Sequence, residues 1–314
     1  MKNLFRIISL ALLIFGLQGC GALRLAYNQA PVAAYWYLDD YLDFNDAQRP
    51  LVKAALRDIH QWHRQTQLPA FVDTLQKLQR QMPQDMNSAQ ACDLYDEVQV
   101  RLRSTFEGMP GLTSPMAKSA NPEAVQVLAT LDRAQLTHLE RRFAKSNLAY
   151  RKDYVAGTPQ RLHAHRLKQA VSRAEMLYGK LEDRQASMLS ARLAQSAFDP
   201  EMTYVERLRR QQDVLETLRA IAGMAVVSTD GTNTVKALNA ATDVTYLQQR
   251  LGDIISRIVQ SPEPRYHDYA QKLRQQSCQT FADLHNSMSP AQRLKALAKL
   301  QDYELDLRAL MIKN

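Results

Sequence analysis

Glycine is scarce in this chain of 314 residues, with 10 copies, which is about half its average share in proteins. Phosphate-cradling loops and tight β-turns depend on glycine, so few of either are expected. Alanine, leucine, glutamine, arginine and lysine are abundant instead, and all five favour helices. Apolar residues recur at helical spacing over most of the chain, whereas strand-like alternation is nearly absent. The sequence therefore predicts an all-α fold, with a single multi-helix domain of about ten helices.

The chain also lacks the short motifs that mark many active sites, such as His-Glu-x-x-His, Gly-x-Ser-x-Gly, Cys-x-x-Cys and the phosphate-binding loop. His60 and His63 stand three apart and would share a helix face, but zinc needs a third ligand and none is evident, so packing and capping roles are favoured. His163 and His165 are two apart and point to different sides of a helix. We predict no catalytic residue, metal or cofactor, although a triad assembled in space stays open.

Cysteine is equally sparse, and the first of three copies follows a distinctive segment. Lys2 and Arg6 form a positively charged start, and an apolar run extends from Leu4 to Leu17. This run is shorter than the roughly 20 residues that span a bilayer. A basic start and a short apolar run are typical of a secretory signal peptide.

The four residues Leu17-Gln18-Gly19-Cys20 resemble the bacterial lipobox, although Gln18 departs from the small or β-branched residue preferred there. The resemblance implies that residues 1–19 are removed as a lipoprotein signal peptide and that Cys20 carries acyl chains. Several chains would anchor the protein on a membrane stably without crossing it. Gly21, rather than Asp, implies sorting to the outer membrane with the body in the periplasm. The alternatives are an ordinary secretory signal with an incidental cysteine, or an N-terminal membrane anchor.

Cys92 and Cys278 remain, an even number in an oxidising compartment. A disulfide between them would join an early helix to a late one, and its long loop would favour a stabilisation of a few kcal/mol. The alternative is two separately buried thiols.

Segment 20–45 is a lead-in rich in aromatic residues, and 46–314 is the helical domain, with loops near 108–121 and 224–236. The aromatic residues either pack into the core or lie at a membrane interface, and the nearby acids Asp39, Asp40 and Asp43 favour the core. A polar residue before proline marks several helix starts, including Asp199-Pro200 and Ser261-Pro262. A tight corner is expected at Leu68-Pro69. The predicted helices lie near 48–66, 69–81, 88–107, 122–130, 133–156, 159–179, 183–198, 200–222, 243–260, 263–286 and 290–312.

One short pattern recurs four times: an apolar residue, a polar residue, two spacers and glutamine. Its mechanism is the capping box, in which the polar side chain and the glutamine each bond the other's backbone N–H. The segments also resemble the Leu-Thr-x-x-Gln motifs of small helical periplasmic stress proteins and chaperones, "MSPAQ" most closely. Four helix starts without further function is the favoured interpretation. The pairs are Asn45 and Gln48, Asp132 and Gln135, Glu182 and Gln185, and Ser289 and Gln292.

Four stretches, "YNQAPVAAYWYLDDYLDFNDAQ", "WHRQTQLP", "YGKLEDRQ" and "HNSMSPAQRLKALAKLQDYELDLRAL", resemble a family of uncharacterised lipoproteins of Gram-negative bacteria. The resemblance implies lipid anchoring and an all-helical body, and supplies no activity. We therefore expect a non-enzymatic envelope protein, with the membrane as a partner through acylated Cys20 and an envelope protein or cell-wall polymer as a second partner. Nucleic acid is not expected, despite the net charge of +8. The alternatives are a periplasmic chaperone or stress-sensing module and, less favoured, a cell-wall or lipid enzyme.

Overall fold

The computed structural model describes residues 21–110, 123–222 and 241–312. Cys20, the predicted signal peptide and most of the two predicted loops lie outside these residues. Every helix or strand element that the described ranges contain is a helix, which confirms the all-α prediction. The elements are α2 (Ala22–Asn28), α3 (Ala30–Leu42), α4 (Gln48–Trp62), η1 (His63–Gln67), α5 (Leu68–Gln81), α6 (Ser88–Glu107), α7 (Glu123–Ala129), α8 (Arg133–Tyr150), η2 (Arg151–Val155), α9 (Pro159–Tyr178), α10 (Asp183–Ala194), α11 (Pro200–Ile221), α12 (Ala241–Val259), α13 (Pro264–Asn286) and α14 (Pro290–Ile312).

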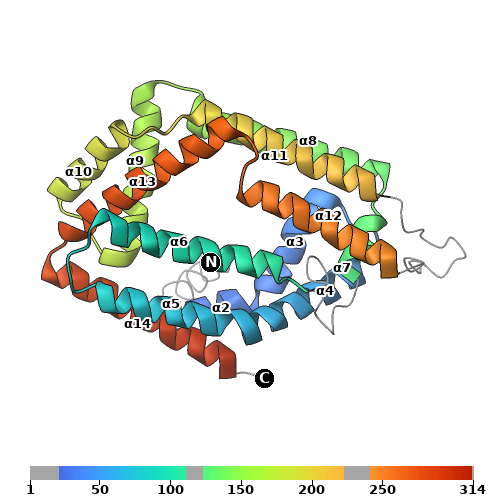
Figure 1. Cartoon of the computed structure of the whole chain (residues 1–314), viewed down its shortest axis with the longest axis horizontal. Coiled ribbons are helices and arrows are strands. Elements are labelled where there is room, and N and C mark those ends of the chain that lie inside the picture. Colours follow the sequence, from blue (N-terminus) through green and yellow to red (C-terminus); the bar gives the residue numbers. More distant parts are fainter. Residues whose placement is uncertain (1–20, 111–122, 223–240, 313–314) are drawn as a thin grey trace, which may run out of the picture.

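The helices trace a closed circuit in which the two halves of the chain interleave (Figure 1). Helix α5 packs against α14, and α6 packs against α13, so early helices lie beside the last ones. Helices α8 and α11 run together along the opposite side, where α11 also packs against α12. These pairings join the N-terminal and C-terminal parts of the chain in one arrangement.

The buried apolar side chains form two separate cores. The first is built from α3, α4, α7, α8, α11 and α12, with Leu139 and Ile221 among its buried side chains. The second is built from α5, α6, α9, α10, α13 and α14, with Tyr178 and Leu189 among its members. Full burial of one such side chain stabilises a fold by roughly 1.5–3 kcal/mol, so both clusters contribute strongly.

The expected corner at Leu68-Pro69 is wrong, because the chain continues from α4 into α5 through the π-helical turn η1. Proline has no N–H and its ring crowds the carbonyl four residues earlier, which normally breaks an α-helix. Here the hydrogen bonds widen to a π pattern, and the Leu68 N–H donates to the carbonyl of His63. Thr66 Oγ1 donates to the Trp62 carbonyl at 2.8 Å. The backbone therefore passes the proline without a corner.

The predicted helix 133–156 matches α8 followed by the π-helical turn η2, which ends at Val155. One other predicted boundary is wrong. The predicted helix 183–198 ends at Ala194, and two later N–H groups bond α13 side chains rather than helix carbonyls. The N–H of Ala197 donates to Gln276 Oε1 at 2.8 Å, and that of Asp199 donates to the hydroxyl of Tyr269 at 3.0 Å.

The lead-in segment contains two helices that the sequence did not predict as separate elements, α2 and α3. Tyr35 and Leu42 of α3 are buried in the first core, whereas α2 buries no residue completely. Across the described ranges, the helices are all too short or too polar to traverse a bilayer.

Candidate functional site

The four predicted capping-box glutamines come together in two pairs. At the starts of α4 and α8, Gln48 and Gln135 are 0 % and 5 % exposed. Gln135 Nε2 donates to Gln48 Oε1 at 2.7 Å, and Gln48 Nε2 donates back to Gln135 Oε1 at 3.3 Å. Each Oε1 also accepts the backbone N–H of its own cap, Asn45 or Asp132, at 3.1 Å. Gln48 Nε2 also donates to the carbonyl of Thr130, just before α8, and Gln135 Nε2 donates to that of Asp43, before α4.

The second pair repeats this geometry at the starts of α10 and α14. Gln185 and Gln292 exchange two hydrogen bonds of 2.9 and 3.0 Å between their side-chain amides. The N–H groups of Glu182 and Ser289 donate to the two Oε1 atoms. Gln185 Nε2 also donates to the Ser287 carbonyl, and Gln292 Nε2 to that of Lys180. Each amide thereby uses two donors and two acceptors, which is its full capacity.

One pair joins the starts of α4 and α8 and the other joins the starts of α10 and α14. All four glutamines are buried. A fifth capping box that the sequence interpretation missed shows the contrast. Asn87 and Gln90 bond reciprocally at 2.9 Å at the start of α6, and the segment "MNSAQ" fits the same pattern. Gln90 is exposed and bonds no second glutamine. The motif therefore marks helix starts, and only pairing between distant helices makes it part of the core.

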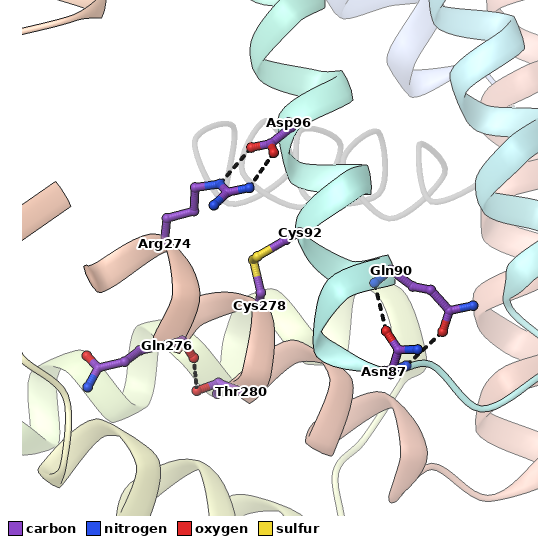
Figure 2. The surroundings of a disulfide bond; sticks show 8 residues. All are labelled: Asn87, Gln90, Cys92, Asp96, Arg274, Gln276, Cys278 and Thr280. Atoms are coloured by element: carbon purple, nitrogen blue, oxygen red, sulfur yellow. Dashed lines mark hydrogen bonds and ion pairs between the residues drawn. A yellow bond between two sulfur atoms is a disulfide. The ribbon is translucent and has the colours of Figure 1, made fainter. Parts of the chain in front are cut away.

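The structure forms a disulfide between Cys92 of α6 and Cys278 of α13, with their Cα atoms 5.1 Å apart (Figure 2). One turn along, Arg274 makes a two-pronged ion pair with Asp96, and its Nε lies 2.7 Å from the carboxylate (Figure 2). Covalent and ionic links therefore connect the same two helices.

The predicted histidines do not form a joint site. His60 Nε2 donates to the Tyr27 carbonyl at 3.0 Å, and the Tyr27 hydroxyl lies 3.0 Å from His63 Nδ1. Burial lowers the pKa of both rings. On α9, His163 lies 2.9 Å from Ser190 Oγ, whereas His165 contacts Tyr154 and Gln169. Within the described residues, no group of three or more His, Cys, Asp or Glu side chains is placed to hold a metal ion.

His285 is a completely buried histidine that the sequence interpretation did not single out. Its Nε2 lies 2.7 Å from the Gln84 carbonyl, which only accepts, so Nε2 carries the hydrogen. Nδ1 then accepts from the Tyr178 hydroxyl at 2.9 Å. Protonation would put a charge in the core and oppose that hydroxyl bond. Burial accordingly lowers the pKa of His285, despite the opposing hydrogen bond to Gln84.

This environment predicts that the protein loses stability on mild acidification. The unfolded chain binds a proton near the ordinary histidine pKa of about 6.5, before the folded chain does, so unfolding becomes easier as the pH falls through that value. The free energy of unfolding should fall by about 1 kcal/mol between pH 7.5 and 5.5, as measured by urea denaturation.

The His285→Gln variant is expected to show a flatter dependence on pH, whatever its absolute stability. His267, whose side chain is 41 % exposed on the same helix, provides the control, and His267→Gln should keep the slope of the native chain. An unchanged slope in the His285 variant would contradict the assignment.

A cleft of about 590 Å³ lies between α6, α11, α12 and α13. Tyr95, Leu102 and Phe106 of α6 are each between 42 % and 43 % exposed and line one wall. Their spacing of seven and four residues places them on one helix face. Such a face is normally buried, and exposed apolar patches often mark a binding site. Ile258 and Val259, at the end of α12, add apolar surface to the opposite side.

The ionisable groups of the cleft are biased to positive charge. Arg103, Arg210 and His267 line it, and no carboxylate lines it among the described residues. Burial raises the pKa of the lining Tyr266, so this phenol stays neutral at physiological pH. A second cavity of about 450 Å³ at the start of α11 differs, because four acids and two arginines share its wall. The larger cleft therefore combines apolar and aromatic surface with basic groups.

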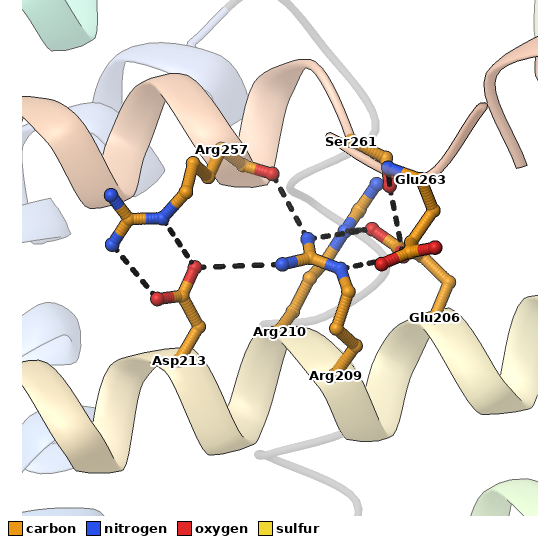
Figure 3. A network of polar contacts seen from close by, with 7 residues as sticks. All are labelled: Glu206, Arg209, Arg210, Asp213, Arg257, Ser261 and Glu263. Atoms are coloured by element: carbon orange, nitrogen blue, oxygen red, sulfur yellow. Dashed lines mark hydrogen bonds and ion pairs between the residues drawn. The ribbon is translucent and has the colours of Figure 1, made fainter.

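A network of charged side chains (Figure 3) shares Arg210 and Ser261 with the lining of this cleft. Glu206 is 4 % exposed and accepts hydrogen bonds from Arg209, Arg210 and Ser261. Burial alone would raise the pKa of Glu206, but these bonds outweigh it and hold the pKa below its ordinary value. Ser261 was predicted to cap α13 before Pro262, which is wrong. The helix begins at Pro264. The Ser261 hydroxyl donates to Glu206 and accepts the N–H of Glu263, which precedes the helix.

The same network positions the basic group that faces the cleft. Arg257 of α12 bonds both carboxylate oxygens of Asp213 at 2.8 Å, so that three arginines surround two carboxylates (Figure 3). Arg210 donates from Nε to Glu206 at 2.7 Å, and its guanidinium group lies 5.6 Å from the ring centre of Tyr266. Its position on the cleft wall is fixed by both contacts.

Comparison with known proteins identifies a family for this chain but assigns it no activity. The profile of a family of unknown function, DUF6279, matches residues 40–223. This range covers more than half of the chain and includes three of the four paired glutamines. Neither a curated protein nor a solved structure matches the chain.

Proposed function

We propose that this chain, which belongs to DUF6279, a family of unknown function, is a non-enzymatic binding protein of the bacterial envelope. The proposal rests on the chain's own residues. The cleft between α6, α11, α12 and α13 holds an anionic amphiphile, meaning a molecule with an apolar body and an acidic head group. The observation that carries this proposal is the lining itself, in which basic groups stand beside exposed apolar side chains without a carboxylate.

The two ligand parts match two parts of the lining. The apolar body would lie along Leu102 and Phe106, which burial would remove from water at a gain of roughly 25 cal/mol per Å². The head group would meet Arg103 and Arg210 at the basic part, and charge-assisted hydrogen bonds are the stronger class. The described lining residues offer apolar and basic contacts, so binding is the role that the geometry supports best.

The envelope location remains part of the proposal. The lipobox resemblance at Cys20 supports a lipid-anchored protein of the outer membrane, on its periplasmic face. The Cys92–Cys278 disulfide supports it independently, because disulfides persist in oxidising compartments such as the periplasm. The chaperone hypothesis rested on the four glutamine boxes. Their glutamines are buried in pairs and offer no surface to a client.

A binding measurement with a defined amphiphile tests the cleft. Lysophosphatidylglycerol, kept below its micelle-forming concentration, should bind the protein in calorimetry. Lysophosphatidylcholine of the same chain length, which is zwitterionic, should bind more weakly. Arg103→Gln should weaken the binding of lysophosphatidylglycerol about tenfold, because it removes one charge-assisted contact.

The matched control is Arg101→Gln, which removes the same charge two residues away on α6, from a side chain that does not line the cleft. It should leave the affinity close to that of the native chain. Equal affinity for both lipids, or equal loss in the two arginine variants, would show that net charge alone attracts the lipid and would overturn the proposal.

A further inference from the structure

An apolar face is exposed on α2 and α3, directly after the predicted anchor. Leu25, Val32, Trp36 and Tyr37 are 50 %, 52 %, 65 % and 64 % exposed. Residues 25, 32 and 36 are spaced by seven and four, so they follow one side of two nearly continuous helices. We call Leu25, Val32, Trp36 and Tyr37 the anchor face.

Along the chain, charged residues are scarce around this face. Arg24 is the only charged residue between positions 21 and 38, and its Nε is 2.9 Å from the buried carboxylate of Asp306. The first exposed acid beyond the face is Asp40, and it pairs with Arg142. The uncharged stretch from residue 25 to residue 38 therefore measures roughly 21 Å along the helix axis.

The opposite side of these helices is fixed to the body of the protein. Tyr35 is buried in the first core, and Tyr27 lies between His60 and His63. Arg64 Nη2 donates to Asn28 Oδ1 at 2.7 Å. These contacts hold α2 and α3 so that the anchor face points away from the protein.

Other strongly exposed apolar residues differ in their surroundings. Leu148, Met176 and Leu294 each stand alone among charged neighbours on their helices, as single surface apolar residues commonly do. The anchor face instead gathers four large exposed side chains within thirteen consecutive residues. It therefore calls for a covering partner.

We propose that a lipid bilayer covers the anchor face, and this rests on the membrane anchoring in the proposed function. The position of the anchor identifies the occupant, because α2 begins two residues after Cys20. Whether acyl chains or the apolar run Leu4–Leu17 attach the chain, the start of α2 is held at the membrane surface. Tryptophan and tyrosine favour the interface between head groups and acyl chains, and an uncharged helix face lies 5–10 Å deep there. Trp36 and Tyr37 supply those two side chains.

The two tryptophans of the chain allow a direct test. The full-length protein is purified from membranes and reconstituted in phosphatidylcholine vesicles, with or without bromine atoms on the acyl chains. In a Trp62→Phe variant, which retains only Trp36, brominated lipid should quench the fluorescence about twofold, because an interfacial indole lies within reach of the upper acyl chain. In a Trp36→Phe variant, which retains only Trp62, quenching should be absent. Trp62 lies against Gly108, on the side of α4 toward α6.

Two measurements distinguish the bilayer contact of the anchor face from the membrane anchoring on which it rests. Flotation of the protein with vesicles, and its loss in a Cys20→Ala variant, tests the anchoring, and failure to float overturns the anchoring and the bilayer contact together. A floating protein whose Trp36 is not quenched by brominated lipid overturns the bilayer contact alone. If Trp36 is then also shielded from aqueous acrylamide, another protein or a second copy covers the face.

Discussion

Removing the disulfide between Cys92 and Cys278 is expected to lower the free energy of unfolding by about 4 kcal/mol. The bridge joins residues 186 apart, and loops of this length lose about 5 kcal/mol of chain entropy in the unfolded state when they are closed. Strain and residual structure usually reduce that gain. The double variant Cys92→Ala/Cys278→Ala, which avoids a buried hydroxyl, should therefore unfold at a clearly lower urea concentration.

The single variants provide the decisive control. Either Cys92→Ala or Cys278→Ala opens the same loop, so each should cost nearly as much as the double variant, and the effects should not add. A reducing agent should bring the native chain to the stability of the variants and leave the variants unchanged. Full additivity of the two single variants, or no response of the native chain to reduction, would show that the bridge does not form.

The disulfide also bears on the proposed binding cleft. Cys92 is one turn from Tyr95, which lines the cleft, and α6 and α13 supply facing parts of its wall. Closing the loop therefore fixes the separation of the two helices that would hold the ligand. A ligand site that is held in place before binding avoids the cost of ordering its walls.

Local chemistry explains how much of the fold could be predicted from the sequence. The start of α11 was predictable because Asp199 accepts N–H bonds from the first turn and Pro200 needs no partner. The start of α13 was not, because Ser261 and Pro262 show the same local signal while Glu206, 55 residues away, captures the serine. A local capping signal therefore indicates where a helix can start, but contacts with residues far along the chain determine whether it starts there.

The candidate cleft was invisible in the sequence for a related reason. The spacing of Tyr95, Leu102 and Phe106 is that of a buried helix face, and only the packed structure shows that the described residues leave these side chains 42–43 % exposed. Arg103 belongs to a mixed-charge segment that resembles an ordinary solvated helix surface. The opposing wall comes from helices more than 100 residues later, which no local pattern connects to α6.

The glutamine pairs carry the second large expected effect. Gln292→Ala should lower the free energy of unfolding by about 3 kcal/mol, because it leaves several buried or partly buried groups without a partner at once. These groups are the Ser289 N–H, the Lys180 carbonyl and one donor and one acceptor of Gln185. Gln90→Ala removes the same atoms from the exposed capping box of α6 and should cost about 1 kcal/mol or less.

A double-mutant cycle separates pairing from capping. If Gln185 and Gln292 contributed only to their own helix starts, the costs of Gln185→Ala and Gln292→Ala would add. Because each amide completes the other's hydrogen bonds, the double variant should cost about 1–3 kcal/mol less than the sum. Gln90→Ala combined with Gln292→Ala should be additive, since Gln90 is not bonded to either glutamine of the pair. Additivity in both cycles would reduce the four boxes to independent caps, whereas coupling in the first alone would establish the buried amide pair as the unit that joins α10 to α14.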